Sequence, residues 1–356
     1  MINLNDVLRE AREKRASDIH FSVGTPPKFR IHGSLVESNF HTISPSDTLE
    51  LLVGFMTHEQ REYFEEFGQI ELSVSVSDFG RLRVNAYKQK GTITIALRLV
   101  NKDIPDAEAF DIPESVLELC DQKKGLVIIA GPSGAGKSSL LAALTDRVNT
   151  NRNCNIITLE DPIEFIHENK KSTVNQREIG LDSKDYPTAM KSALRSDPDV
   201  LTLSRLRDSE VASLVLTAAE TGRLVFVSMS ANNTVEALGS FLEIFPMQER
   251  VMARYRLSDV LKAVVCRQLL HTTAGESVPA YELFFNKGVS KGLIREGDIM
   301  KITSFIAQNT QDGMLTMDQC LIAMCLSGAI TASDAKSGAQ NQEAVEKALQ
   351  KQGLNA

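Results

Sequence analysis

One short segment combines glycines, a lysine and serines at a spacing suited to holding phosphate groups. Residues 131–138 read GPSGAGKS and match the pattern G-x-x-x-x-G-K-[ST]. In this pattern backbone N–H groups curl around the phosphates, Lys137 can reach the β- and γ-phosphates, and the Ser138 hydroxyl can ligate Mg²⁺. The segment therefore predicts a site for ATP and Mg²⁺. The residues expected to bind the nucleotide are Gly131, Pro132, Ser133, Gly134, Ala135, Gly136, Lys137, Ser138 and Ser139.

The residues on either side of this loop predict the elements that such a site requires. Leu126–Ala130 is an apolar run typical of a buried strand, and Ser139–Val148 is rich in helix formers. A helix beginning at the loop would direct its positive dipole end at the phosphates. A glycine-rich turn without a ligand is the alternative, and the strand–loop–helix context argues against it.

Two acidic residues follow a second predicted strand. Glu160 and Asp161 come directly after Asn155–Leu159. The carboxyl ends of parallel strands face the ligand crevice in open α/β sheets, so these carboxylates could act on a bound ligand. The alternative is that they cap the turn that follows, which is equally compatible with Asp161, whereas a functional role is favoured for Glu160.

The alternation of apolar strands and helices from Gly125 onward predicts a parallel α/β sheet, with further strands at Val200–Leu203 and Leu224–Ser228. After Gly288 the pattern is helical to the end of the chain. Pro105, Pro113 and several acids predict a linker and a short helix over residues 101–124.

Residues 1–100 predict a separate α/β domain with a β-rich pattern. A helix over Ser46–Phe67 is expected to open at Ser46 and Asp47, which suit an N-cap. The other expected elements are a helix at Leu4–Lys14 and strands at Ile19–Val23, Lys28–Val36, Ile70–Val76, Arg81–Lys88 and Thr92–Val100.

The composition of the 356-residue chain excludes several classes of protein. A net charge of −7 argues against a protein whose main partner is nucleic acid. Five scattered cysteines without a C-x-x-C pair fit a reduced cytoplasm and give no zinc pattern. The charged N-terminus lacks an apolar signal region, and no apolar run is long enough to span a bilayer.

Several blocks of sequence resemble the type IV pilus retraction (twitching-motility) ATPases of the type II/IV secretion ATPase superfamily. They are ASDIHFSVGTPPKFRIHG (16–33), ITLEDPIEFIHENKKSTVNQREIG (157–180), ALRSDPDV (193–200), LTAAETGRLVF (216–226) and LIRE (293–296). The resemblance implies a PAS-like domain (1–100), a linker (101–124) and a RecA-like P-loop ATPase domain with C-terminal helices (125–356). It also implies a ring of six subunits at the cytoplasmic side of the inner membrane, beside a pilus platform protein.

Two positions depart from the family pattern. Where the family has Gly-Glu after the strand that follows DPD, this chain has Ser204 and Arg205, so an arginine replaces the Walker B acid. Where the family has a histidine after its Phe-Gly-Thr strand, this chain has Ser230. A guanidinium is permanently charged and can neither ligate a cation nor accept a proton.

The resemblance also assigns roles to residues that the P-loop pattern does not cover. It makes Glu160 the remaining candidate for the general base that activates water. Arginines of the N-terminal domain reach the nucleotide across a subunit boundary in related rings, and Arg81 and Arg83 are the candidates here, with Arg98 a weaker one. The alternative for these arginines is a solvated strand face, because charged and apolar residues alternate there.

Three functions are compatible with these observations. The chain could be an ATP-binding ring subunit with impaired hydrolysis that works alone or beside an intact paralogue. It could be a fully active retraction motor that uses Glu160. A nucleic-acid motor built on the same core is the third interpretation, which the acidic charge balance disfavours.

Overall fold

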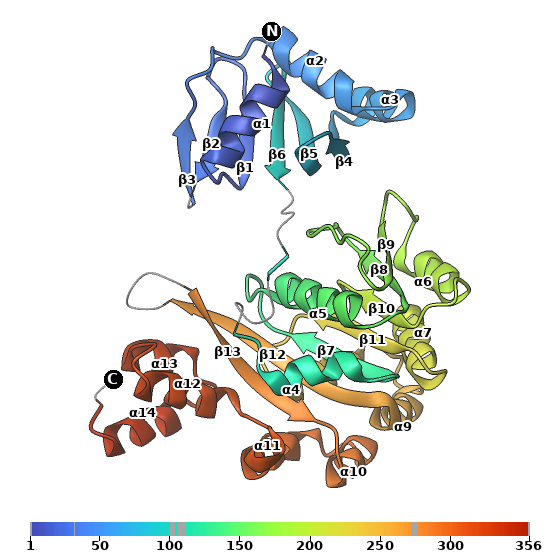
Figure 1. Cartoon of the computed structure of the whole chain (residues 1–356), viewed down its shortest axis with the longest axis vertical. Coiled ribbons are helices and arrows are strands. Elements are labelled where there is room, and N and C mark those ends of the chain that lie inside the picture. The colour runs from blue at the N-terminus through green and yellow to red at the C-terminus, as the bar shows by residue number, and fades with distance from the viewer. Residues whose placement is uncertain (1, 32, 100–103, 106–110, 272–276, 355–356) are drawn as a thin grey trace. The chain divides into compact units, whose positions relative to one another are not determined.

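The structure, a computed structural model, describes residues 2–31, 33–99, 104–105, 111–271 and 277–354. The chain divides into two compact units, Met1–Asp103 with Glu164–Ile166, and Ile104–Ile163 with His167–Ala356 (Figure 1). Each unit has its own apolar core.

The first unit is an antiparallel sheet covered by helices, with strand order β3-β2-β1-β6-β5-β4. Strands β5 and β6 alternate buried apolar residues with exposed or half-buried ones, so one face of the sheet contributes Leu82, Val84 and Leu97 to the core. The elements are α1 (Leu4–Glu13), β1 (Asp18–Phe21), β2 (Lys28–Ile31), β3 (Ser34–Glu37), α2 (Pro45–Phe55), α3 (His58–Phe67), β4 (Gln69–Val76), β5 (Gly80–Gln89) and β6 (Thr92–Leu99).

Two predicted elements of this unit are each split in the structure. The expected strand Lys28–Val36 is two antiparallel strands, β2 and β3, paired from Lys28–Glu37 to Ile31–Ser34. The expected helix Ser46–Phe67 is two helices, because the backbone becomes extended at Met56 and Thr57 caps the next helix. The first of them is capped by Ser44 rather than by Ser46 or Asp47. Asp47 instead accepts the Ser44 N–H and completes a capping box.

The second unit contains a mixed, mostly parallel sheet of order β13-β12-β7-β11-β10-β8-β9. Among the described strands of this unit, only the β12–β13 pair is antiparallel. Its strands are β7 (Gly125–Ala130), β8 (Asn155–Glu160), β9 (Thr173–Glu178), β10 (Val200–Leu203), β11 (Leu224–Met229), β12 (Leu261–His271) and β13 (Ser277–Phe285). This sheet and the antiparallel sheet of the first unit confirm the predicted α/β fold class.

Helices pack against this sheet and form two cores. The larger core surrounds β7, β10 and β11, whose residues are almost all buried. A smaller core joins α12–α14 to the last residues of β12 and the first residues of β13 (Figure 1). The helices are α4 (Glu114–Leu117), α5 (Lys137–Asn151), α6 (Tyr186–Leu194), α7 (Ser209–Glu220), α8 (Thr234–Glu243), α9 (Arg250–Val260), α10 (Val289–Glu296), α11 (Ile302–Gln308), α12 (Met317–Leu326), α13 (Ala332–Gly338) and α14 (Gln342–Lys351), with short 3₁₀ helices η1 (Glu118–Asp121), η2 (Ile299–Lys301) and η3 (Thr310–Asp312).

The segment predicted as a linker, 101–124, has two parts. Residues 101–103 and 106–110 lie outside the described residues. Ile112, Val116 and Cys120 are buried in the core of the second unit, so that unit already includes residues ahead of Gly125. None of the helices in the described part of the chain is long and apolar enough to cross a bilayer.

Candidate functional site

The predicted phosphate loop joins β7 to α5 at the carboxyl edge of the second sheet. All six residues of β7 are buried, whereas Pro132, Ser133 and Gly134 are exposed. Gly134 and Gly136 have φ angles of +80° and +76°, a left-handed conformation that favours glycine. The nine predicted nucleotide-binding residues, 131–139, therefore form a loop with an exposed tip and the first turn of α5.

A third glycine of the loop is required by a close approach of two backbones. A Cβ atom on Gly131 would lie 2.3 Å from the carbonyl oxygen of Arg267 on β12. No side chain fits in that space, because real Cβ atoms do not approach a backbone oxygen so closely. Gly131 thus lets the loop leave β7 directly against the neighbouring strand.

Lys137 lies folded over the loop. Its ammonium donates to the carbonyl oxygens of Gly131 at 2.9 Å and Pro132 at 2.7 Å. Both acceptors belong to the loop itself, so the ammonium is held beside the position that phosphate groups occupy in P-loop proteins. A phosphate oxygen can replace these carbonyls as a stronger, charged acceptor.

Arg267 on β12 supports the loop by a hydrogen bond, a role that was not predicted from the sequence. Its side chain is among the largest fully buried ones, its Nη1 donates to the Gly136 carbonyl at 3.1 Å, and its guanidinium lies 5.8 Å from the Tyr281 ring centroid. Burial lowers the pKa of Arg267 from its ordinary value. The available signal was a single arginine inside the apolar run of β12, LKAVVCRQLLH. A charge in a buried strand needs a specific partner.

Glu160 ends β8 at the same edge of the sheet, with its carboxylate already oriented. Oε1 accepts the Thr158 hydroxyl at 2.6 Å and the Gln176 amide at 3.0 Å. Gln176 lies on β9, a strand that the sequence pattern did not reveal. A half-buried carboxylate held in this way can orient a water molecule or accept its proton.

Arg205 and Asp161 form an ion pair immediately beside Glu160. Leu203 pairs with Leu159 in the parallel β10–β8 register, so the residues that follow the two strands become neighbours. Nη1 of Arg205 lies 3.1 Å from Oδ2 of Asp161, and the two side chains are 45% and 39% exposed. The position at which the resemblance predicts an acid therefore holds a cation, and that cation is paired with Asp161.

Ser204 and Tyr186 extend this network. Ser204 Oγ accepts the Asp161 N–H at 3.1 Å and lies 2.9 Å from the Tyr186 hydroxyl. Burial is the largest cause that raises the pKa of Tyr186 to about 12, so the phenol stays protonated near neutral pH. Ser230, the other altered position, is exposed just after β11, the strand between β7 and β10.

The residues at this edge provide only part of a Mg²⁺ site of the P-loop kind. Such a site uses a P-loop hydroxyl and an acid after a neighbouring strand. Ser138 supplies the hydroxyl on the first turn of α5, but Arg205 supplies a cation in place of the acid. Across the described residues, no group of three or more His, Cys, Asp or Glu side chains could hold a metal ion.

The predicted arginines of the first unit lie on β5. Arg83 forms an ion pair with Glu71, and the neighbouring Arg98 on β6 lies 2.8 Å from Asp18. Arg81 is half-buried and pairs across the strands with Ser75. The contacts of Arg83 and Arg98 are those of a polar sheet face, and the role of Arg81 and Arg83 at a neighbour's nucleotide stays a prediction.

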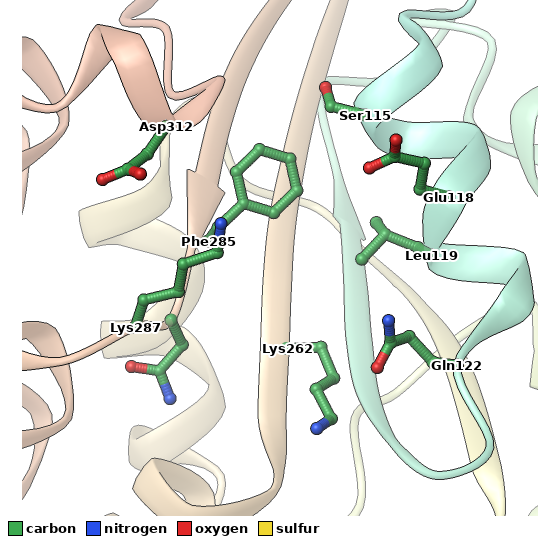
Figure 2. A pocket seen from close by; sticks show the side chains of 9 residues that line it. Ser115, Glu118, Leu119, Gln122, Lys262, Phe285, Lys287 and Asp312 are labelled. Atoms are coloured by element: carbon green, nitrogen blue, oxygen red, sulfur yellow. The ribbon is translucent and has the colours of Figure 1, made fainter.

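A cavity of about 300 Å³ lies in the second unit but at the other edge of the sheet. Figure 2 shows its wall formed by Phe285 of β13 facing Glu118 and Leu119. Lys262, at its base, lies beside Gly125 at the start of β7. The loop follows the other end of this strand, roughly 16 Å away at the usual rise per residue. The cavity is therefore separate from the phosphate loop.

Comparisons with known proteins agree with this arrangement. The family model described as "Type II/IV secretion system protein" matches residues 1–315. The type IV pilus retraction ATPase PilT of Pseudomonas aeruginosa is 34% identical over 342 residues, which cover 96% of this chain and 99% of PilT. The type IV pilus ATPase PilU of the same organism is 35% identical over 94% of this chain and 88% of its own length.

A solved structure is also similar over nearly the whole chain. It is the crystal structure of the pilus retraction motor PilT with bound ADP, with a TM-score of 0.91 and 36% sequence identity, and it covers 98% of this chain and 100% of that one. The chain therefore belongs to the type II/IV secretion system protein family, and within it to the PilT- and PilU-like type IV pilus ATPases.

Proposed function

We propose that this protein is an ATP-binding ring subunit of a type IV pilus retraction motor whose own hydrolysis is weakened. The observation that carries the proposal is the contrast between a complete phosphate loop and an arginine at the end of β10 that is ion-paired with Asp161. Nucleotide binding in the PilT relative, which was solved with ADP, supports the first half. The loss of the acid supports the second.

The binding step follows from the loop geometry. Backbone N–H groups of the loop and the N-terminus of α5 attract the phosphates, and Lys137 exchanges its two carbonyl contacts for phosphate oxygens. Arg267 keeps the loop in place by holding the Gly136 carbonyl. The Ser138 hydroxyl stays the predicted ligand for Mg²⁺.

The hydrolysis step has fewer groups to support it. Glu160 is the one predicted base, and its Oε1 already accepts two hydrogen bonds, so this oxygen has little capacity left for a water molecule. The neighbouring Asp161 carboxylate is engaged by Arg205. A base held in this way, without a partner acid and a histidine, gives slow turnover.

A fully active motor is the second candidate, and the orientation of Glu160 favours it. The same hydrogen bonds also fix the Glu160 carboxylate, so that it can orient a water molecule for attack on a phosphate. Turnover of ATP by the purified protein, measured alone and mixed with an intact homologue from the same cell, separates the two. The proposal is supported if the purified protein by itself turns over ATP slowly and changes the turnover of the homologue in the mixture. Brisk turnover by the purified protein by itself favours the second candidate.

The assembly and its location are part of the same proposal. We expect a homo-hexamer or a mixed ring with an active paralogue, in the cytoplasm against the inner-membrane pilus platform protein, without nucleic acid and without membrane insertion. In that ring Arg81 and Arg83 would face the nucleotide of a neighbour. Light scattering at micromolar concentration with ATP tests the ring, and a monomer under these conditions would contradict it.

A further inference from the structure

Helix α3 of the first unit buries very little of its own surface. Phe64 is its one buried residue, and Gln60 is half-buried. The helix is held instead at its two ends, by the capping box of Thr57 with Gln60 and by Gly68, whose φ angle of +71° closes the last turn. Because both ends are fixed, α3 presents its remaining surface to solvent on a stable helix.

Two aromatic rings are exposed next to each other on this helix. Tyr63 and Phe67 are 50% and 56% exposed, and their ring centroids lie 4.5 Å apart. A single exposed apolar residue is common on protein surfaces, whereas adjacent ones with a polar rim are typical of interaction sites. Tyrosine and phenylalanine are enriched at protein interfaces, and a tyrosine ring loses little conformational entropy when it is covered. The pair is therefore suited to contact another molecule.

Three glutamates lie beside the two rings. They recur at spacings of three and four residues, which places them in one row along the helix. With the rings they form a surface that we call the acidic–aromatic face, which consists of Glu59, Glu62, Tyr63, Glu66 and Phe67. All five residues are exposed. Among the described residues, the one basic side chain in ion-pairing distance of these glutamates is His58, at 3.6 Å from Glu62.

The charge pattern of α3 works against the helix itself. Glu62 and Glu66 are four residues apart, and like charges at this spacing destabilise a helix. The last turn contains Glu65 and Glu66 and no basic residue, although the negative end of the helix dipole lies there. Arg61, the one arginine of α3, donates to the Val53 carbonyl of α2. The helix therefore gains no stability from this row of glutamates, whereas a basic partner would neutralise it.

We propose that the acidic–aromatic face of α3 is a docking surface for an arginine-rich segment of a partner protein. A guanidinium pairs with carboxylates and stacks on aromatic rings, so arginine fits both halves of this face. Nucleic acids and anionic membranes have the same sign of charge as the glutamates. A second copy of this chain also does, with its net charge of −7. The inference goes beyond the proposed function, because it does not involve the nucleotide site.

The test is fluorescence anisotropy of a fluorescein-labelled synthetic peptide rich in arginine and leucine, titrated with the full chain at physiological ionic strength. We expect binding, and we expect the same peptide with glutamate in place of arginine to bind about tenfold more weakly or worse. Tyr63→Ser combined with Phe67→Ser should weaken binding by about tenfold or more, because aromatic anchors dominate such contacts. Glu62→Gln combined with Glu66→Gln should weaken it by about three- to tenfold, since exposed ion pairs contribute less.

A matched control separates this face from the net charge of the chain. Glu343→Gln combined with Glu346→Gln removes the same charge from α14 and should leave the affinity within about twofold of the wild type. An equal loss in this control and in the α3 glutamate variant overturns the inference, and so does unchanged affinity in both α3 variants. The midpoint of urea unfolding should stay the same or rise for Glu62→Gln with Glu66→Gln, because a repulsion is removed. Weaker binding by such a variant cannot then come from unfolding.

Two other occupants of this face would give different results. If a second copy covers it, gel filtration without peptide should show self-association that Tyr63→Ser with Phe67→Ser abolishes. If a membrane covers it, the wild type should sediment with phosphatidylserine vesicles and the same variant should not. Either result overturns the inference. The proposed function is unaffected by these outcomes, because ATP binding should be the same in the wild type and in the α3 variants.

Discussion

The phosphate loop and the ends of β8 and β10 lie at one edge of one sheet, yet they differ in chemical content. The loop gathers groups that attract phosphate, namely exposed backbone, Lys137 and the start of α5, over the buried guanidinium of Arg267. At the strand ends the acids meet a cation, and Arg205 and Asp161 satisfy each other. The difference teaches that, under the proposed function, nucleotide binding and nucleotide hydrolysis depend on separate groups of residues at one sheet edge.

The largest effect is expected from restoring the family residues at the strand ends. Arg205→Glu combined with Ser230→His should raise the turnover number, because it adds an acid and a histidine where acid–base groups typically contribute about 10²–10⁴-fold. Steady-state ATP hydrolysis measures the change. Arg205→Gln, which removes the cation without adding an acid, is the control and should give no comparable gain. Brisk wild-type turnover that falls in the double variant would mean that Arg205 itself acts in hydrolysis.

Arg267→Met breaks the support of the loop while keeping an apolar stem in the core. It removes the bond to the Gly136 carbonyl and the contact with Tyr281, and we expect a loss of about 2–4 kcal/mol in the free energy of unfolding. Urea denaturation measures this value. Arg195→Met, at an exposed position, should change it by about 0.5 kcal/mol or less. Equal stability of both variants would show that Arg267 does not hold the loop.

Lys137→Ala removes the cation of the loop and leaves the strand ends unchanged. Because charge-assisted hydrogen bonds to phosphate are lost, ATP affinity should fall by roughly 10–100-fold. Isothermal titration calorimetry gives the affinity, and circular dichroism verifies folding. Lys123→Ala, exposed before β7, is the matched control. Unchanged affinity in a folded Lys137 variant would refute the assignment of the loop.

Asp161→Asn should have the smallest effect on stability. The ion pair with Arg205 is partly exposed on both sides, so screening by solvent limits its contribution to about 1 kcal/mol or less. Thermal unfolding followed by circular dichroism measures the change. A much larger loss would mean that this pair is a structural support like Arg267, and the contrast between the two regions would disappear.

Much of the second unit follows from local patterns. The buried runs of β7, β8, β10 and β11 were predicted because continuous apolar strands between helices indicate a parallel sheet. Strand β9 was missed since its sequence, TVNQRE, is polar and only partly buried at an edge of the sheet. Local patterns also failed at the break between α2 and α3, where Thr57 forms a new capping box inside a continuous helical pattern.

The amino-acid sequence by itself determined the phosphate loop and the Ser204–Arg205 pair after β10, and its family resemblance predicted that this arginine replaces an acid. Both segments are contiguous in the chain, and their chemistry depends on residue type and on spacing of a few residues. Tertiary structure alone decided what surrounds them. It brought Arg267 into contact with the carbonyl of Gly136, which lies 131 residues earlier in the chain. It also brought Arg205 beside Asp161, which lies 44 residues earlier. Such partners are invisible in one sequence, because strand order and register, not distance along the chain, choose which side chains meet.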